Sequence, residues 1–352
     1  MEAYYPDPLP LKKIKEEKYK EIIMEINLEL GRFDGMLKFN SEKEIVEAFL
    51  RAEEVLAAAS LEVSELSFDE YWDKLLDRGY EADDLVEIRF MIDDYSKYYQ
   101  EDFSLDLLNS FQESLYNNRN RRRLEQSQLH RTRQGWLVQA TKRFDIRLYI
   151  HPKEDKIRFL FNDLNNFIRK SQLHPLITAA IAYGQLVMIH PWRYANGRVT
   201  GSLIPFLFNH LGITRERNFY LSSIFSQEKE HYYQQLVSLF KAKTWDEWIY
   251  YFLRKLQEQL IKINEHKTPL IINTYRNCSN ELNKLESKLT SKYVDTLFSN
   301  PIFSKREIEG KYSFINYGTL SDYTFLLIEL GYIIKDNRKR HINYVFAILK
   351  EL

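Results

Sequence analysis

Residues that interrupt helices are scarce in this chain, which has 11 glycines and 9 prolines among 352 residues. Glycine and proline are the least favourable residues in a helix interior, and the plentiful Leu, Glu and Lys are good helix formers. We therefore expect long helices to dominate and the fold class to be all-α. The length is sufficient for two or more domains with a substantial core.

The charge balance and the single cysteine limit the classes of partner and compartment. Fifty basic residues balance fifty acidic ones, so no global field attracts the chain to nucleic acid or to an anionic membrane. Cys278, the only cysteine, excludes an internal disulfide and is consistent with a reducing cytosol. The first ten residues lack a signal pattern, and the longest near-apolar run, residues 176–189, is too short to cross a bilayer. We expect a cytoplasmic protein without a membrane partner.

Apolar residues recur at helical spacing along most of the chain. A first helix is predicted from Ile14 to Leu30, with Gly31 as its end. Residues 41–44 (Ser-Glu-Lys-Glu) match a capping box, which predicts the start of a second helix that extends to Leu61. Further helices are predicted over residues 69–80, 83–99, 156–170, 175–189, 198–211, 228–241 and 244–265. The segment 175–189 is apolar nearly all round and is predicted to be the central buried helix.

The pattern changes to period two between Arg131 and Pro152. Residues 136–138 and 143–150 alternate in this way and are rich in β-branched and aromatic side chains. This pattern predicts a β-hairpin.

After Thr268 and Pro269 the composition turns toward Asn, Lys and Ser, which suggests a domain boundary. Helices are expected over residues 287–299, 306–311 and 317–330, followed by strands at 332–334 and 343–348 that flank a basic tip. This order is typical of a winged helix, in which the helix that starts near Thr319 would enter a DNA major groove. Arg338, Lys339 and Arg340 would then reach phosphates. A protein-docking module with a solvated hairpin tip is the alternative, because the rest of the chain is not basic.

The segment from His190 to Arg198 (His-Pro-Trp-Arg-Tyr-Ala-Asn-Gly-Arg) combines groups suited to phosphate chemistry. A histidine at the end of a buried helix can act as a general base near neutral pH. Asn196 and Gly197 permit a tight turn and place main-chain N–H groups at the start of the next helix, where an anion binds readily. Arg198 can grip a phosphate with two hydrogen bonds. Together these groups suit phosphoryl or nucleotidyl transfer; the alternative is a simple turn after a core histidine.

This loop resembles the signature of the Fic family: His-Pro-Phe, any residue, an acidic residue, Gly-Asn-Gly-Arg, two positions and a second Arg. The resemblance extends over nearly the whole chain, through residues 5–10, 30–35, 131–136, 174–180, 204–205, 220–222, 232–233 and 245–248. It implies a helical bundle in which the loop joins two central helices, with a β-hairpin flap and a C-terminal winged helix-turn-helix domain. The implied domains are a helical N-terminal region (1–110), a Fic core (111–267) and the winged helix (268–352). The implied reaction transfers AMP from ATP to a Ser, Thr or Tyr hydroxyl of a protein.

The resemblance assigns a role to four residues of the loop. His190 corresponds to the catalytic base that deprotonates the attacking hydroxyl. Asn196 and Gly197 correspond to the anion cradle, by which we mean the N–H groups at the start of the helix after the loop. Arg198 corresponds to the phosphate-binding arginine.

Three positions depart from the family signature. Tyr194 replaces the acidic residue that would hold magnesium, and a neutral phenol is a poor ligand for this hard cation, so we expect no metal site. Ala195 replaces a glycine and adds a methyl group where the backbone approaches phosphate. Gly201 replaces the second arginine, which would grip the γ-phosphate. Two hypotheses stay open: a Fic-type transferase that uses ATP or another phosphate-containing donor, and a degenerate Fic scaffold that binds a nucleotide, a partner or DNA.

Two further elements bear on regulation and partners. Glu62, in the segment 58–63, aligns with the glutamate of an inhibitory helix that pairs with the second arginine in Fic proteins of this type. Since Gly201 provides no arginine, we expect no such salt bridge, and a solvated acid on a Glu-rich helix is the alternative. The hairpin would dock a segment of a target protein by main-chain pairing, and the basic residues 142–147 favour an acidic target. We also consider a homodimer.

Overall fold

The computed structural model describes residues 5–9, 11, 14–63, 66–76, 92, 104–120, 130–140, 145–215, 219–284, 290–336 and 342–352. Long helices account for most of these residues, and strands occur only in a two-stranded and a three-stranded sheet within them. The predicted all-α fold class is therefore confirmed.

Helix α7 (Pro175–Ile189) lies at the centre of the helical bundle, as predicted. Nearly every side chain along it is buried, and it contacts α6 (Ile157–Lys170), α8 (Asn196–His210) and α11 (Trp245–Lys262). Pro175 occupies the first helical position, where its missing N–H costs nothing. The other central helix, α8, packs against α7, against α2 (Lys43–Glu62) and against α5 (Leu105–Asn120).

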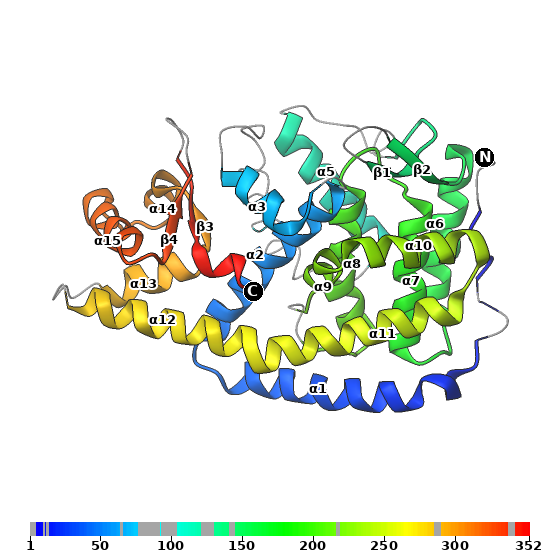
Figure 1. The fold of residues 1–352 in the computed structure, drawn as a ribbon, viewed down its shortest axis with the longest axis horizontal. Coiled ribbons are helices and arrows are strands. Elements are labelled where there is room, and N and C mark those ends of the chain that lie inside the picture. Colours follow the sequence, from blue (N-terminus) through cyan, green and yellow to red (C-terminus); the bar gives the residue numbers. More distant parts are fainter. Residues whose placement is uncertain are drawn as a thin grey trace.

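A long helical run borders the bundle and lies beside α1 (Lys20–Phe39) (Figure 1). It begins as α11, passes through one π-helical turn at Ile263–Lys267 and continues as α12 (Thr268–Asn283). The boundary expected at residues 267 and 268 thus lies within continuous helix, because Pro269 is placed in the first turn after the π-helical segment. A short 3₁₀ turn, Glu16–Tyr19, precedes α1.

Two predicted helix ends are wrong, and packing explains the first. Helix α1 continues through Gly31 to Phe39, since the buried side chains of Leu30, Phe33 and Leu37 extend the core-facing stripe beyond the glycine. This burial outweighs the ~1 kcal/mol that a glycine costs inside a helix. The capping box at residues 41–44 does not form, because Asn40 Oδ1 accepts the Glu42 N–H at 2.9 Å and α2 begins at Lys43.

The predicted hairpin is confirmed. Strands β1 (Trp136–Ala140) and β2 (Asp145–Ile150) pair antiparallel, from Trp136 opposite Ile150 to Ala140 opposite Asp145. The pairing continues just below the strands, where the His151 N–H donates to Gly135 O at 3.1 Å. The base of the hairpin therefore closes next to the end of α7, against which His151 lies.

Three shorter helices complete the part of the bundle that surrounds α2. They are α3 (Phe68–Leu76), α9 (Ser222–Gln227) and α10 (Lys229–Ala242). Helix α9 packs on α2, and α10 packs on α11 and β2. The helix predicted over residues 83–99 lies outside the described residues, apart from residue 92.

The predicted helices and strands of the C-terminal part are present. Helices α13 (Thr290–Phe298), α14 (Lys305–Lys311) and α15 (Tyr317–Glu329) precede strands β4 (Ile333–Lys335) and β5 (Tyr344–Phe346) and the 3₁₀ turn Ala347–Lys350. Ile302 and Phe303 form a further strand, β3, which pairs with β5 and completes the order β3-β5-β4. The basic tip at 338–340 lies outside the described residues. Phe49 of α2 packs on Phe298 and Phe346.

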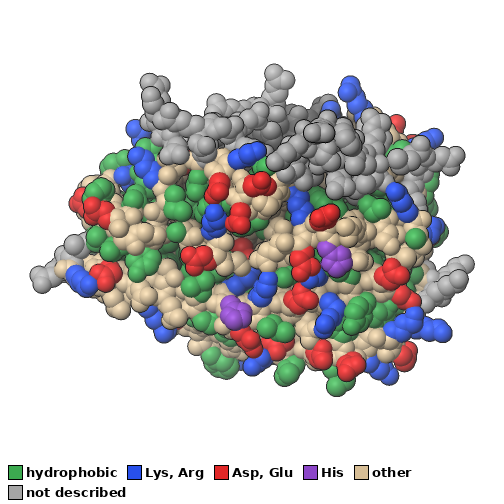
Figure 2. All heavy atoms as spheres, in the orientation of Figure 1, with side chains coloured by type: hydrophobic (Ala, Val, Ile, Leu, Met, Phe, Trp, Pro, Cys, Tyr) green, Lys and Arg blue, Asp and Glu red, His purple; other side chains and the backbone are tan. Residues whose placement is uncertain are grey.

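The surface is mixed in charge. On the face shown in Figure 2, acidic and basic side chains are interspersed, as the equal counts of the two signs lead one to expect. Among the described residues, no helix combines the length and hydrophobicity that crossing a bilayer requires.

Gly31 provides a test of how packing extends α1. No atom lies within 4 Å of a Cβ built at this residue, so Gly31→Ala should stabilise the protein by about 0.5–1 kcal/mol through helix propensity. The control is Gly331→Ala, because Gly331 adopts φ +79° after α15 and a side chain there should destabilise by about 1 kcal/mol. Urea unfolding measures both, and a loss of stability in Gly31→Ala would contradict the account.

Candidate functional site

The loop between the central helices starts with His190, which ends α7 in a left-handed conformation (φ 48°). Its N–H still donates to Leu186 O at 3.0 Å. His190 is half-buried, and its imidazole stacks on the buried ring of His151, with centroids 4.2 Å apart and an interplanar angle of 16°. His151 is in turn held by a contact of 3.1 Å between Nδ1 and Met188 O. The orientation of the His190 ring is therefore supported by a second ring at the base of the hairpin.

Both imidazoles are neutral at physiological pH. Burial of the ring lowers the pKa of His190 to about 3, and the nearby Arg131 guanidinium acts in the same direction. Burial also holds the pKa of His151 well below its usual range, with His190 as the second cause. A neutral His190 can accept a proton, but a base with so low a pKa is weaker than one with a pKa near 7.

Arg131 binds the loop to the base of the hairpin. Its Nε donates to His190 O at 2.9 Å, and its terminal nitrogens donate to Arg133 O at 3.2 Å, to Ile189 O at 3.4 Å and to Pro152 O. The Arg131 N–H also donates to Pro191 O at 2.9 Å. The sequence resemblance identified Arg131 only as the start of the flap and missed this positioning role, because the carbonyls that it joins are distant in the chain.

Asn196 closes the loop on itself. Its Oδ1 accepts the Trp192 N–H at 3.0 Å, and its Nδ2 donates to Trp192 O at 2.8 Å. Ala195, immediately before it, has φ 58°, a conformation that costs an ordinary residue about 1–2 kcal/mol. The Asn196 side chain therefore shapes the cradle, whose N–H groups belong to the start of α8.

Glu62 occupies this cradle. One carboxylate oxygen, Oε1, accepts the Arg198 N–H at 3.1 Å, and the other, Oε2, accepts from Nε and a terminal nitrogen of the Arg198 guanidinium, each at 2.8 Å. A Cβ at Gly197 would lie 3.1 Å from Oε1, so the glycine permits this close approach. The alternative of a solvated acid at Glu62 is therefore wrong. The carboxylate pairs with the first arginine because Arg198 and the start of α8 form an anion site even without the second arginine.

The Tyr194 ring packs beside the Arg198 guanidinium. Its ring centroid lies 4.6 Å from Arg198 Cζ, a distance at which the ring attracts the cation. Among the described residues, no group of three or more His, Cys, Asp or Glu side chains is arranged to hold a metal ion. The carboxylate on the cradle, Glu62, is already paired with Arg198. The residues present therefore do not fit a magnesium ion bound as the family signature implies.

The position of the absent second arginine is filled by a buried acid that the sequence reasoning missed. Glu54 accepts the Ser222 N–H at 2.8 Å and the Ser222 hydroxyl at 2.5 Å. A Cβ at Gly201 would lie 2.7 Å from Glu54 Oε1 and 2.8 Å from Ser222 Oγ. Burial raises the pKa of Glu54 to about 8, so at neutral pH this side chain is mostly an uncharged carboxylic acid. The sequence contained only a weak signal, a glutamate between Ala52, Val55 and Leu56 on a helix buried nearly all round.

The protonation of Glu54 makes the stability depend on pH. Because its pKa is raised in the folded state, the folded protein keeps a proton that the unfolded chain releases, and stability falls as pH rises from about 4.5 to 8. Glu54→Gln keeps the side-chain length and an oxygen that can accept hydrogen bonds, but it has no proton that titrates in this pH range. The stability of the wild type relative to Glu54→Gln should therefore fall by about 2–4 kcal/mol between pH 5 and pH 8.5. Urea unfolding at both pH values measures this difference, with exposed Glu44→Gln on the same helix as the control. A difference that does not change with pH would contradict the prediction.

Comparison with known proteins supports the assignment of this loop. The family model of the Fic/DOC family matches residues 102–207, which include the whole loop and Gly201. A solved structure of a Fic family protein from Desulfovibrio desulfuricans G20 has a TM-score of 0.57 and 13% sequence identity, and the alignment covers 97% of this chain and 98% of that one. It shows that the fold is shared over nearly the full length.

Two other solved structures share a smaller part of the chain. A Fic domain containing signaling protein from Bacteroides thetaiotaomicron VPI-5482 has a TM-score of 0.48 and 12% identity, with 70% of this chain and 98% of that chain covered. Fic-1 (residues 134–508) from C. elegans has a TM-score of 0.47 and 15% identity, with 70% and 73% covered. The family-model match identifies residues 102–207, which contain the His190 loop, as a Fic/DOC family domain.

Proposed function

We propose that this protein is a Fic-type transferase in a closed state, which transfers AMP from ATP to a Ser, Thr or Tyr hydroxyl of a target protein once Glu62 leaves the cradle. The observation that supports this most directly is the Glu62 carboxylate on Arg198 and on the start of α8. A site that binds a carboxylate through an N–H group and a guanidinium has the donors that a phosphate requires.

In the proposed reaction the phosphates of ATP replace the Glu62 carboxylate. The hydroxyl oxygen of the target forms a bond to the α-phosphorus, the bond from that phosphorus to the bridging oxygen breaks, and pyrophosphate leaves. His190 takes the hydroxyl proton, and Arg131 and His151 hold its backbone and ring in place. Arg198 and the N–H groups of α8 stabilise the phosphate charge, which is the main catalytic term in such reactions.

The departures from the family signature predict a slow reaction. A metal that bridges phosphates contributes several kcal/mol of charge stabilisation, and each ~1.4 kcal/mol corresponds to a factor of ten in rate. Tyr194 supplies no metal ligand, and Gly201 together with Glu54 leaves no room for a second arginine. We therefore expect ATP transfer to be slower than in a family member with the complete signature.

The same departures from the family signature favour a second function. In this alternative the protein is a degenerate Fic scaffold that binds a nucleotide or a partner at the cradle but does not transfer AMP. Glu54 beside Gly201 supports this alternative, because it occupies the space next to residue 201, where the family signature has a second arginine for the γ-phosphate.

We further propose that the hairpin β1–β2 docks the target segment by adding a strand and that the C-terminal part is a winged helix that contacts another protein. Helix α15 supports the second proposal, since its sequence from Tyr317 to Glu329 contains no Lys or Arg. It exposes Asp322, Phe325 and Glu329 to solvent instead. A helix with these side chains lacks the cations that bind DNA phosphates.

The proposed transferase is tested with labelled ATP in a host lysate. Glu62→Ala should label proteins at least about tenfold more than wild type, because it removes the carboxylate that competes for the cradle, and Glu62→Ala with His190→Ala should abolish the labelling. The control is Glu47→Ala on the same helix. Labelling that is insensitive to His190, or absent in Glu62→Ala, would contradict transfer. In the latter case, calorimetric ATP binding to Glu62→Ala would identify the scaffold.

A further inference from the structure

Lys229, the first residue of α10, contacts the chain on both sides of Glu62. Its ammonium donates to Ser60 O at 2.7 Å, to Leu66 O at 3.1 Å and to Val63 O. One turn further along α10, the Tyr233 hydroxyl donates to Leu61 O. These contacts bind α10 to four carbonyls at the end of α2 and in the turn after it.

A cation such as the Lys229 ammonium stabilises the C-terminal end of α2. The last carbonyls of a helix have no partners within the helix and carry a partial negative charge, which repels a carboxylate in the last turn. Glu62 is the last residue of α2, and that last turn contains no basic residue of its own. Lys229 therefore compensates both the unpaired carbonyls and the unfavourable position of Glu62.

We propose that Lys229 and Tyr233 form a latch that positions Glu62 in the anion cradle, so that α10 controls whether the cradle is closed. The latch holds the backbone on both sides of Glu62, and the side chain then reaches Arg198 on α8. The consequence for nucleotide access rests on the proposed function, whereas the mechanical role of the latch does not.

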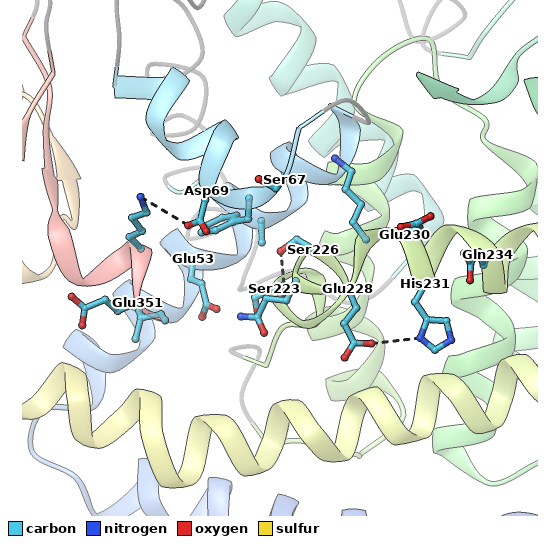
Figure 3. A pocket seen from close by; sticks show the side chains of 16 residues that line it. Glu53, Ser67, Asp69, Ser223, Ser226, Glu228, Glu230, His231, Gln234 and Glu351 are labelled. Atoms are coloured by element: carbon cyan, nitrogen blue, oxygen red, sulfur yellow. Dashed lines mark hydrogen bonds and ion pairs between the residues drawn. The ribbon is translucent and has the colours of Figure 1, made fainter. Parts of the chain in front are cut away.

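The latch lies beside a cavity. Lys229 lines a cavity of about 760 Å³ between α2, α3, α9, α10 and the C-terminal residues. Figure 3 shows Ser67 near the start of α3 on one side of this cavity and Glu228 and His231 at the start of α10 on the other. Lys229 therefore contacts the end of α2 and also lines this cavity. Burial of the ammonium lowers the pKa of Lys229 to about 8.

Hydrogen exchange tests the latch directly. The Arg198 amide donates to Glu62 Oε1, so its exchange rate reports whether Glu62 occupies the cradle. Lys229→Met removes the charge with little change in length and should accelerate exchange of the Arg198 amide, and of amides 60–63, by at least about tenfold. Lys229→Arg should retain slow exchange, because it keeps the cation. The matched control is Lys241→Met, since Lys241 is exposed on the same helix.

Tyr233→Phe provides a second, milder variant, which removes only the hydroxyl bonded to Leu61 O. It should accelerate exchange at the same amides by a smaller factor. Exchange at Arg198 that is unchanged in both Lys229→Met and Tyr233→Phe would overturn the latch. An equal acceleration in Lys241→Met would also overturn it, because the effect would then be general destabilisation.

Calorimetric titration with inorganic tripolyphosphate separates the latch from the proposed function. If both hold, Lys229→Met and Glu62→Ala should each bind tripolyphosphate at least about tenfold more tightly than wild type, and the double variant should gain nothing beyond Glu62→Ala alone. If exchange at Arg198 accelerates but neither variant binds tripolyphosphate, the latch is supported and the nucleotide-binding function is contradicted. Tight binding to Glu62→Ala with unchanged exchange in both Lys229→Met and Tyr233→Phe supports the function and overturns the latch.

Discussion

The interaction on which the site depends is the pairing of Glu62 with Arg198 at the start of α8. It joins the last residue of α2 to the first turn of a central helix and is therefore a contact between two elements of the bundle. Energetically it combines a charge-assisted ion pair with a helix-terminus anion site, and Arg198 is buried. Removal of either partner would leave an uncompensated charge, so the closed state is favoured until another anion can replace the carboxylate.

The rest of the loop is arranged around this pair. Asn196 and Arg131 satisfy the backbone of the loop, and Tyr194 packs its ring on the arginine. The residues at positions that depart from the family signature thus make specific contacts with their neighbours. Glu54 beside Gly201 is the clearest example, because restoring a side chain at residue 201 would require the buried acid to move. In the proposed reaction the protein uses a neutral His190 as base and Arg198 as the phosphate-binding arginine, and Tyr194 supplies no carboxylate for magnesium.

The sequence was sufficient for the elements with strong periodicity and insufficient for contacts between them. Residues 175–189 and the hairpin strands were predicted because their patterns follow directly from burial. Gly31 was misjudged as a helix end, because a local propensity of ~1 kcal/mol is smaller than the burial of the three apolar residues on α1 around it. His190, Asn196, Gly197 and Arg198 were identified as a group, but the partner of Glu62 was not. The roles of Arg131, Glu54 and Lys229 depend on carbonyls and hydroxyls far away in the chain, which no spacing rule reveals.

The central claim is that Glu62 and Arg198 are energetically coupled, and a double-mutant cycle measures this coupling most directly. Unfolding free energies of the wild type, Glu62→Gln, Arg198→Met and the double variant, from urea titrations at pH 7, give the interaction energy of the pair. We expect a favourable coupling of at least about 1.5 kcal/mol, which is well above the ~0–1 kcal/mol of an exposed salt bridge. A coupling near zero would show that the carboxylate does not occupy the cradle in solution and would contradict the closed state.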